Sequence, residues 1–405
     1  MSVVAGLDLG TGKTCVVVAE VDEHGVAVAG VGTAVSRGLR KGVIVNVEST
    51  VNAIAKAVAE AESMAGCQIR RVVASIGGAH LRGLSSHGVV AVRNGEVSAG
   101  DLRRVLDAAR AVALPADREV LHVLPQEYVI DKQEGIKEPV GIAGVRLESK
   151  VHIVTSQTAA AQTLVKCCRQ AGLVVDDVLL GSLAAADAVL TPEEKDLGVA
   201  LVDIGAGTTD LVIFHGGAVT HTATLPLGGG HLTNDIAAGL RTPTAEAEKI
   251  KQRYGCARAA AVDAEAAIEV PSVGDREPRI LRRRILCEII EPRVEEIFTL
   301  VGREMARSGY DDGLASGVVL TGGSAALQGI ADVAEGIFRL PVRIGLPHHV
   351  TALEDLVASP AHATAIGLVL AGAQGRGGVR MTPAVPAGVL ERARVRVGEW
   401  LRDFF

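Results

Sequence analysis

The hydrophobic residues at the start of the chain are arranged in short runs, which glycine-containing segments separate. Valine and alanine dominate these runs, and β-branched residues between turn residues favour strands. The runs are residues 3–9, 14–21 and 26–34. They predict three sequential strands that form a meander.

A helical pattern follows the meander. In residues 47–65 the apolar residues Ile54 and Val58 lie one helical turn apart, and the pattern stops at Gly66. Residues 71–76 then predict a buried strand. Because helices follow strands, the chain has the pattern of an α/β protein.

The arrangement of strand, aspartate and glycine-rich turn occurs twice. Asp8 ends the first strand and precedes the turn at 10–12. Asp203 ends a second apolar run and precedes the turn at 205–207. This internal repeat predicts two similar domains that face each other.

Two further segments interrupt the repeat. One combines alternating strands with a helix capped by Ser98 and Asp101, which indicates an inserted α+β subdomain. The other is mostly helical. The predicted parts are a first domain at 1–83 and 158–197, its inserted subdomain at 84–157, a second domain at 198–230 and 305–371, its helical insertion at 231–304, a linker at 372–388 and an amphipathic helix at 389–405.

Composition narrows the function classes. The chain has 41 Lys+Arg and 47 Asp+Glu, a formal net charge of −6, which disfavours a basic nucleic-acid-binding protein. Its six cysteines include no C-x-x-C pair, which fits a reducing compartment better than a disulfide framework or a zinc site. Residues 1–9 lack a basic signal-peptide start, and Pro360 interrupts the longest uncharged run. We therefore expect a cytoplasmic protein with a buried helix in that run.

Gly12, Lys13 and Thr14 suggest a P-loop, but their context does not fit that motif. The motif needs an earlier glycine where this chain has Leu7, and a helix where residues 14–21 are strand-like. The alternative is a pair of hairpin turns whose backbone N–H groups bind phosphates, with the aspartate of each strand holding Mg²⁺ through water. Two such turns would hold one polyphosphate.

A third motif follows a later strand. The apolar run 318–321 leads into Gly322, Gly323 and Ser324, and a diglycine allows a flat ring to lie against the backbone. Two phosphate turns followed by a diglycine resemble the actin-like ATPase superfamily, which binds ATP in the cleft between two domains.

Three other segments make the resemblance more specific, and it extends over nearly the whole chain. They are similar to the FtsA family of bacterial cell-division proteins. The segments are residues 124–131, 226–237 and 269–274. The resemblance implies a two-domain actin-like fold that lacks one usual subdomain and carries a different one, here at 84–157.

The resemblance implies ATP and Mg²⁺ as cofactors. It places Glu248 and Lys251 at the ribose, although their spacing also fits a solvated helix face. Ala206 stands where many relatives have a glycine, so we expect binding to survive and ATPase activity to be weak or absent. The predicted nucleotide residues are Asp8 and Asp203, which also hold the metal through water, with Gly10, Thr11, Gly12, Lys13, Gly205, Gly207, Thr208, Thr209, Gly228, Gly229, Gly230, Glu248, Lys251, Gly322, Gly323 and Ser324.

The segment 389–405 is amphipathic. It contains Trp400, the only tryptophan of a chain with 2% aromatic residues, and combines aromatic residues with arginines, as interfacial membrane helices do. A helix that packs back on the protein is the alternative. The predicted membrane-facing residues are Val397, Trp400, Leu401, Phe404 and Phe405.

The resemblance implies a protein that forms filaments and tethers FtsZ to the inner face of the cytoplasmic membrane at the division site. It also implies that other division proteins bind the inserted subdomain and that the C-terminal tail of FtsZ docks on the helical insertion, where arginines can pair with an acidic peptide. The predicted docking residues are Arg282, Arg283, Arg284 and Phe298. For the docking residues, the alternative is an ordinary solvated face. For the function of the protein, the alternatives are a pilus-assembly relative and a small-molecule kinase of the same superfamily.

Overall fold

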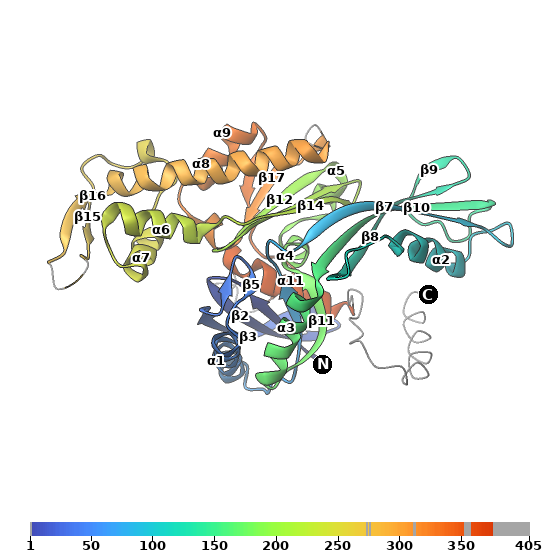
Figure 1. Cartoon of the computed structure of the whole chain (residues 1–405), viewed down its shortest axis with the longest axis horizontal. Coiled ribbons are helices and arrows are strands. Elements are labelled where there is room, and N and C mark those ends of the chain that lie inside the picture. Colours follow the sequence, from blue (N-terminus) through green and yellow to red (C-terminus); the bar gives the residue numbers. More distant parts are fainter. Residues whose placement is uncertain (1, 273, 275–276, 311–312, 352–357, 376–405) are drawn as a thin grey trace.

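The computed structural model describes residues 2–272, 274, 277–310, 313–351 and 358–375. Two sheet-based domains pack together, an antiparallel subdomain extends from one side, and a mostly helical part extends from the other (Figure 1). The predicted amphipathic helix at 389–405 lies outside the described residues.

The first domain is built on a five-stranded sheet of order β11-β6-β1-β2-β3. The predicted meander is confirmed, because β1, β2 and β3 pair antiparallel, while β6 pairs parallel with β1 and with β11. The strands are β1 Ser2–Leu9, β2 Lys13–Asp22, β3 Gly25–Val35, β6 Arg71–Ile76 and β11 Val174–Leu180. A short hairpin of β4 (Leu39–Arg40) and β5 (Val43–Ile44) follows β3.

The predicted helix after the meander is confirmed as α1, Val47–Ala65. Asn46 caps its start, because the Asn46 side chain accepts a hydrogen bond from the Ser49 N–H. Gly66 ends it in the left-handed conformation that glycine adopts most easily. Helix α3, Thr158–Gln170, lies against α1.

The second domain repeats the topology of the first. Its sheet has the order β14-β13-β12-β17-β18, in which an antiparallel meander is again extended by parallel strands. The strands are β12 Val199–Ile204, β13 Thr209–His215, β14 Ala218–Leu225, β17 Val318–Thr321 and β18 Val342–Ile344. The internal repeat seen in the sequence therefore corresponds to two sheets with the same strand order.

The inserted subdomain has its own antiparallel sheet of order β7-β10-β8-β9, with one helix packed on it. The predicted capping box is confirmed, since Ser98 and Asp101 cap each other's backbone N–H groups at the start of that helix. The elements are β7 Arg82–Ala91, α2 Ala99–Arg110, β8 Arg118–Ile130, β9 Gln133–Ile136 and β10 Arg146–Gln157.

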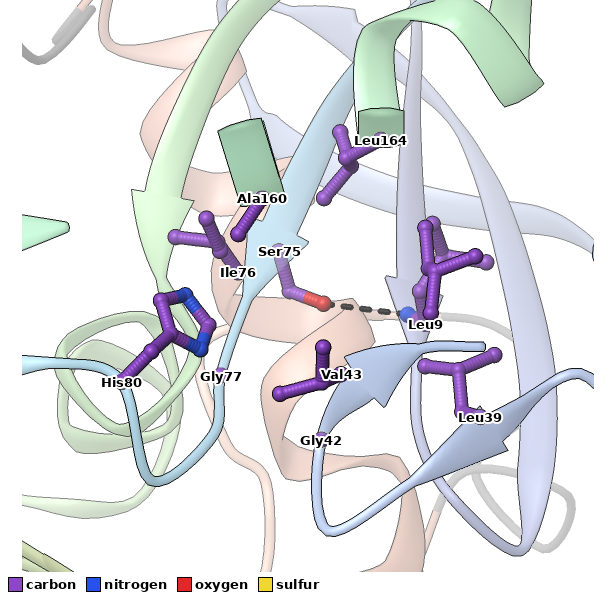
Figure 2. A pocket seen from close by; sticks show the side chains of 11 residues that line it. Leu9, Leu39, Gly42, Val43, Ser75, Ile76, Gly77, His80, Ala160 and Leu164 are labelled. Carbon is purple, nitrogen blue, oxygen red and sulfur yellow. Dashed lines mark hydrogen bonds between the residues drawn. The ribbon is translucent and has the colours of Figure 1, made fainter. Parts of the chain in front are cut away.

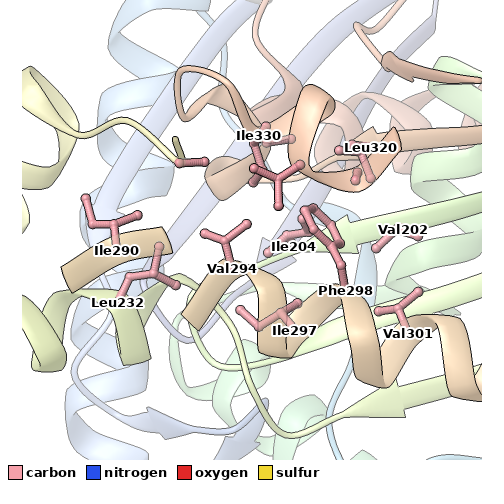
Figure 3. Close-up of a cluster of buried hydrophobic side chains, with 14 of the residues drawn as sticks. Val202, Ile204, Leu232, Ile290, Val294, Ile297, Phe298, Val301, Leu320 and Ile330 are labelled. Carbon is pink, nitrogen blue, oxygen red and sulfur yellow. The ribbon is translucent and has the colours of Figure 1, made fainter. Parts of the chain in front are cut away.

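The helical part of the second domain surrounds one long helix, α8, which contains Pro292. Residues 280–282, expected to be helical, instead belong to a strand, because Leu281 pairs with Ile268 across a hairpin. The elements are α6 Gly229–Leu240, α7 Thr244–Tyr254, β15 Ala267–Val270, β16 Arg279–Arg282, α8 Arg283–Ser308 and α9 Ile330–Phe338. Figure 3 shows how α8 packs through Val294 and Phe298 against the sheet residues Ile204 and Leu320.

The last described helix, α11 (Ala363–Ala373), is buried, as expected for the uncharged run. Helix α11 packs on β1 and on α4, Gly181–Val189. A short helix, α5, Pro192–Leu197, follows α4 in the chain. A Cβ on Gly367 would lie 1.7 Å from the Ala184 carbonyl oxygen, so only glycine permits this approach. Among the described helices, none combines the length and the hydropathy that crossing a membrane requires.

Candidate functional site

The two glycine-rich turns meet where the two domains join. Each turn is closed by the same hydrogen bond: the Gly10 N–H donates to the Lys13 carbonyl oxygen, and the Gly205 N–H to the Thr208 carbonyl oxygen, both over 3.0 Å. A Cβ on Gly12 would lie 2.8 Å from the Ala206 Cβ. The structure therefore brings the two predicted turns into direct contact.

The first turn is supported by a buried serine that the sequence analysis did not identify. The Ser75 hydroxyl donates to Asp8 Oδ1 over 2.8 Å and accepts a hydrogen bond from the Leu9 N–H over 3.0 Å. Burial raises the pKa of Asp8, while Ser75 and the charge of Lys13 act in the opposite direction. Asp8 is thus held at the base of the turn in a site where a cation would stabilise its charge.

The second turn has two partly buried carboxylates beside it, Asp203 and Asp210. Burial, together with Asp210 and Asp8, raises the pKa of Asp203 to about 7. The pKa of Asp210 is raised to about 6, mainly by burial. Asp203 Oδ2 accepts a hydrogen bond of 3.3 Å from the Thr364 hydroxyl.

Three coupled acids and one nearby lysine leave negative charge that a divalent cation could compensate. Within the described ranges, no group of three or more His, Cys, Asp or Glu side chains has the arrangement of direct metal ligands. Asp210 was missed as a site residue, although it follows Thr208 and Thr209 directly in the repeated motif.

The three glycines at the start of α6, which were predicted to lie near the nucleotide, lie on the second turn. The Gly229 N–H donates to the Gly205 carbonyl oxygen over 2.9 Å, and the Gly230 N–H to the Ala206 carbonyl oxygen over 2.8 Å. A Cβ on Gly228 would lie 2.4 Å from the Gly205 carbonyl oxygen. The turn and the helix start thus form one rigid unit.

Glu248 and Lys251 are joined to this unit by hydrogen bonds. Lys251 Nζ donates to the Gly229 carbonyl oxygen over 3.0 Å, to Thr233 Oγ1 over 2.9 Å and to Glu248 Oε2 over 2.7 Å. The Lys251 side chain is only 13% exposed, which argues against a solvated position for Lys251, whereas the Glu248 side chain is 39% exposed. A Cβ on Gly229 would also lie 2.1 Å from Ser324 Oγ, so the third motif adjoins the same place.

The two glycines of the third motif have different surroundings. Gly322 has a φ of +85°, and a Cβ there would lie 2.2 Å from Asp203 Oδ1, so this position requires glycine. A Cβ on Gly323 would meet only the Ala361 Cβ, at 3.9 Å. Gly323 therefore presents an open backbone face on which a flat ring could lie.

The hydroxyl groups of the predicted site threonines have different hydrogen-bond partners. Thr209 is fully buried, and its hydroxyl donates to the Leu227 carbonyl oxygen over 2.9 Å, so it supports the turn and does not face a ligand. Thr11 Oγ1 accepts a hydrogen bond of 2.9 Å from the Gly42 N–H at the tip of the β4–β5 hairpin. The hairpin contact was not visible in the sequence, because it depends on the fold of residues far from the turn.

A small cavity lies behind the first turn, between the β4–β5 hairpin, the end of β6 and α3 (Figure 2). Its volume is about 20 Å³, and Leu9, Ser75 and His80 are among the residues that line it. This volume suits a single water molecule. The cavity is therefore too small for a nucleotide, and it does not compete with the paired turns as the candidate site.

The predicted docking residues are not all at the surface. Arg282 is 67% exposed, whereas Arg283 donates from Nε to the Tyr254 carbonyl oxygen over 2.7 Å. Arg284 Nε lies 3.1 Å from Glu288 Oε1. Phe298 is fully buried and packs edge-on against Phe338, with ring centroids 5.4 Å apart. The predicted contact of Phe298 with a partner peptide is therefore wrong, because its side chain belongs to the core.

Comparison with known families and proteins gives consistent matches. A family model described as cell division protein FtsA matches residues 200–367, and one described as the SHS2 domain inserted in FtsA matches residues 78–155. The cell division protein FtsA of Pseudomonas aeruginosa is 54% identical over 92% of this chain and 89% of its own length. FtsA of Escherichia coli is 41% identical over 99% of this chain and 98% of its own length.

Solved structures with the same fold are more distant. A PilM–PilN type IV pilus biogenesis complex aligns with a TM-score of 0.68 and 19% identity, over 91% of this chain and 98% of that one. MreB5 of Spiroplasma citri bound to ADP aligns with a TM-score of 0.52 and 14% identity, over 91% and 95%. At these identities the likeness shows the fold alone: an actin-like ATPase fold with an inserted SHS2 domain.

Proposed function

We propose that this chain, which belongs to the FtsA family of cell-division proteins, binds ATP with Mg²⁺ where its two domains join. One observation carries this proposal: each domain contributes a glycine turn and a partly buried aspartate to the same place. Backbone N–H groups of the turns would bind the phosphates, and Asp8 and Asp203 would orient the metal's water shell. Lys251 and Glu248 would hold the ribose, and Gly323 would lie under the base.

The bound nucleotide would serve assembly rather than rapid turnover. In this proposal the protein forms filaments and tethers FtsZ to the inner face of the cytoplasmic membrane at the division site. The aromatic and basic composition of residues 389–405 supports membrane attachment. The exposed Arg282 supports docking of an acidic FtsZ tail on the helical part, without Phe298. The inserted subdomain would bind other division proteins.

The pilus and kinase alternatives are less well supported. The pilus complex matches in fold at 19% identity, whereas the FtsA relatives match at up to 54% over most of the chain. A kinase would also need a carboxylate base aimed at a hydroxyl substrate, a role that this proposal assigns to neither Asp8 nor Asp203, because both would hold the water shell of the metal.

The test is a fluorescent-ATP titration of the full chain and of Asp203→Ala. Removal of this carboxylate leaves the metal and phosphates less well compensated, so we expect at least about tenfold weaker binding, which corresponds to about 1.4 kcal/mol. Asp332→Ala, at an exposed position of α9, is the matched control. Equal affinity of Asp203→Ala and the control, with both folded by circular dichroism, would contradict the proposed site.

A further inference from the structure

We propose that the inserted subdomain is docked on the edge strand β14 of the second domain through His152 and Thr222, and that this docking and nucleotide binding strengthen each other. The coupling rests on the proposed function, whereas the docking rests on contacts alone. Its consequence is that the nucleotide would control how the inserted subdomain is presented to partners.

The connectivity makes this docking informative. The inserted subdomain lies between β6 and α3 and so belongs to the first domain along the chain. In space, however, β7, β8 and β10 contact β14, the edge strand of the second sheet (Figure 1). The inserted subdomain therefore bridges both domains, and any change in their relative position must act on this contact.

Two side-chain hydrogen bonds form the docking contact. His152 Nε2 lies 2.8 Å from Thr222 Oγ1, and these residues are only 2% and 8% exposed. Gln126 Nε2 donates to the Val219 carbonyl oxygen over 3.0 Å, on the same edge strand. A buried hydrogen bond of this kind fixes position strongly, because a lost partner leaves a polar group without water.

The side chains of Thr222 and His152 lie so close to Gly83 that no larger residue fits at this position. A Cβ on Gly83 would lie 2.5 Å from Thr222 Oγ1 and 2.8 Å from His152 Cε1. A cavity of only about 10 Å³ marks the junction of all three parts. Its walls include Gly83 and Val154 of the inserted subdomain, Leu180 and Ser182 of the first domain, and Thr222 and Thr224 of the second.

The same strand supports the second phosphate turn. Thr224 lies two residues after Thr222, on the same face of β14, and its hydroxyl donates to Asp210 Oδ1 over 2.5 Å. Asp210 Oδ2 in turn accepts a hydrogen bond of 3.1 Å from Thr208, which belongs to the turn. Thr222 and Thr224 thus link the docking contact to the turn over two residues of one strand.

The direction of the coupling follows from the contact between the turns. A phosphate bound to the N–H groups of both turns requires the two domains to be in the arrangement in which Thr11 meets Gly207. The contact of His152 with Thr222 requires the same arrangement. Two interactions that favour one arrangement stabilise each other, and the effect is reciprocal.

The experiment measures the distance between the inserted subdomain and the second domain. Spin labels are attached at Glu134→Cys in β9 and Arg303→Cys in α8, both exposed, in a Cys67→Ser background because the other described cysteines are buried. Thr222→Val removes the hydroxyl at nearly constant volume. Thr220→Val is the matched control, since the Thr220 hydroxyl bonds to Ile213 within its own sheet.

Without nucleotide, we expect Thr222→Val, but not Thr220→Val, to broaden the distribution of distances between the two spin labels. Saturating ATP with Mg²⁺ should narrow it again. The affinity of Thr222→Val for ATP, measured by equilibrium dialysis, should fall about fivefold or more. Gly83→Ala should broaden the distribution as well, whereas Gly100→Ala in α2, whose Cβ would meet Ser98 Oγ at 3.5 Å, should not.

The outcomes separate the two parts of the proposal. If Thr222→Val and Gly83→Ala match their controls without nucleotide, the docking is overturned. If they differ from the controls but ATP does not narrow the distribution, the coupling is overturned and the docking stands. If the wild-type protein binds no ATP, the proposed function fails together with the coupling, and the distances without nucleotide still decide the docking.

Discussion

Thr11 of the first turn lies directly against Gly207 of the second turn, so that a Cβ on Gly207 would be 2.4 Å from the Thr11 hydroxyl oxygen. The turns come from different domains, and each is closed by its own backbone hydrogen bond. Their N–H groups therefore form a single surface only while the domains keep this arrangement. The proposed nucleotide binding would therefore depend on the arrangement of the two domains at this contact.

The first prediction concerns Gly207→Ala. The added methyl group should push the two turns apart. Because both turns are needed to bind the phosphates in the proposed site, ATP binding should weaken about tenfold. Gly336→Ala in α9 is the control, because its Cβ would meet no atom within 4 Å. Equal ATP affinities of the two variants would show that the contact between turns is unimportant for binding.

The second prediction contrasts neighbouring glycines. Gly323→Val should fold normally and lose nucleotide binding, because its side chain fills the open face on which the base would lie. Gly322→Val should instead impair folding, since φ is +85° and the space is occupied by Asp203. Thermal unfolding and ATP titration of both variants check this; normal ATP affinity of Gly323→Val would place the base elsewhere.

The third prediction concerns pH and stability. The pKa of Asp203 is about 7 and that of Asp210 about 6 in the folded protein, against an ordinary value of 3.8. Between pH 4 and 7 the folded state therefore holds protons that the unfolded chain has released, so its stability decreases as the pH rises.

Asp203→Asn removes the contribution of Asp203 to this titration and leaves that of Asp210. We expect it to raise the free energy of unfolding at pH 8 by on the order of 2–4 kcal/mol and to flatten the pH dependence, while ATP binding is lost. Urea unfolding between pH 5 and 8 measures both effects, with Asp332→Asn as the exposed control. A steeper pH dependence in Asp203→Asn would contradict the assignment.

The fourth prediction separates core from surface in the helical part. Phe298→Ala should lower the free energy of unfolding by about 3–5 kcal/mol, because it leaves a cavity beside Phe338. Arg282→Glu should leave stability nearly unchanged and weaken binding of an acidic FtsZ tail peptide. Peptide binding that is unchanged in Arg282→Glu would remove this arginine from the docking site.

The fifth prediction concerns residues 389–405. A chain that ends at Gly388, or one with Trp400→Glu, should stay in the supernatant with anionic vesicles while it still binds ATP. Glu391→Gln on the polar face is the control and should pellet. A single segment binds weakly, and several segments on one filament bind firmly through effective concentration. Pelleting should therefore increase with protein concentration; equal pelleting of Trp400→Glu and the control would falsify the anchor.

The sequence predicted those features that depend on local pattern. The meander, α1 with its caps and the two turns follow from runs of valine, helical spacing and paired glycines, which act over a few residues. Ser75 and Thr364 were missed because their roles arise from packing between distant segments, whereas Asp210 was missed although it directly follows the threonines of the second turn. Phe298 was misplaced because an aromatic residue on an amphipathic helix gives no sign of which side it faces.

Helix α11 completes the first domain from the far end of the described chain. It packs on β1, and a Cβ on Gly6 would lie 2.6 Å from the Ala365 carbonyl oxygen. During synthesis on the ribosome, the emerging β1 must therefore wait, with this face uncovered, until the entire second domain has been translated. Neither half of the proposed nucleotide site can reach its final form early, so the nascent chain exposes apolar sheet surface for as long as the second domain is being made.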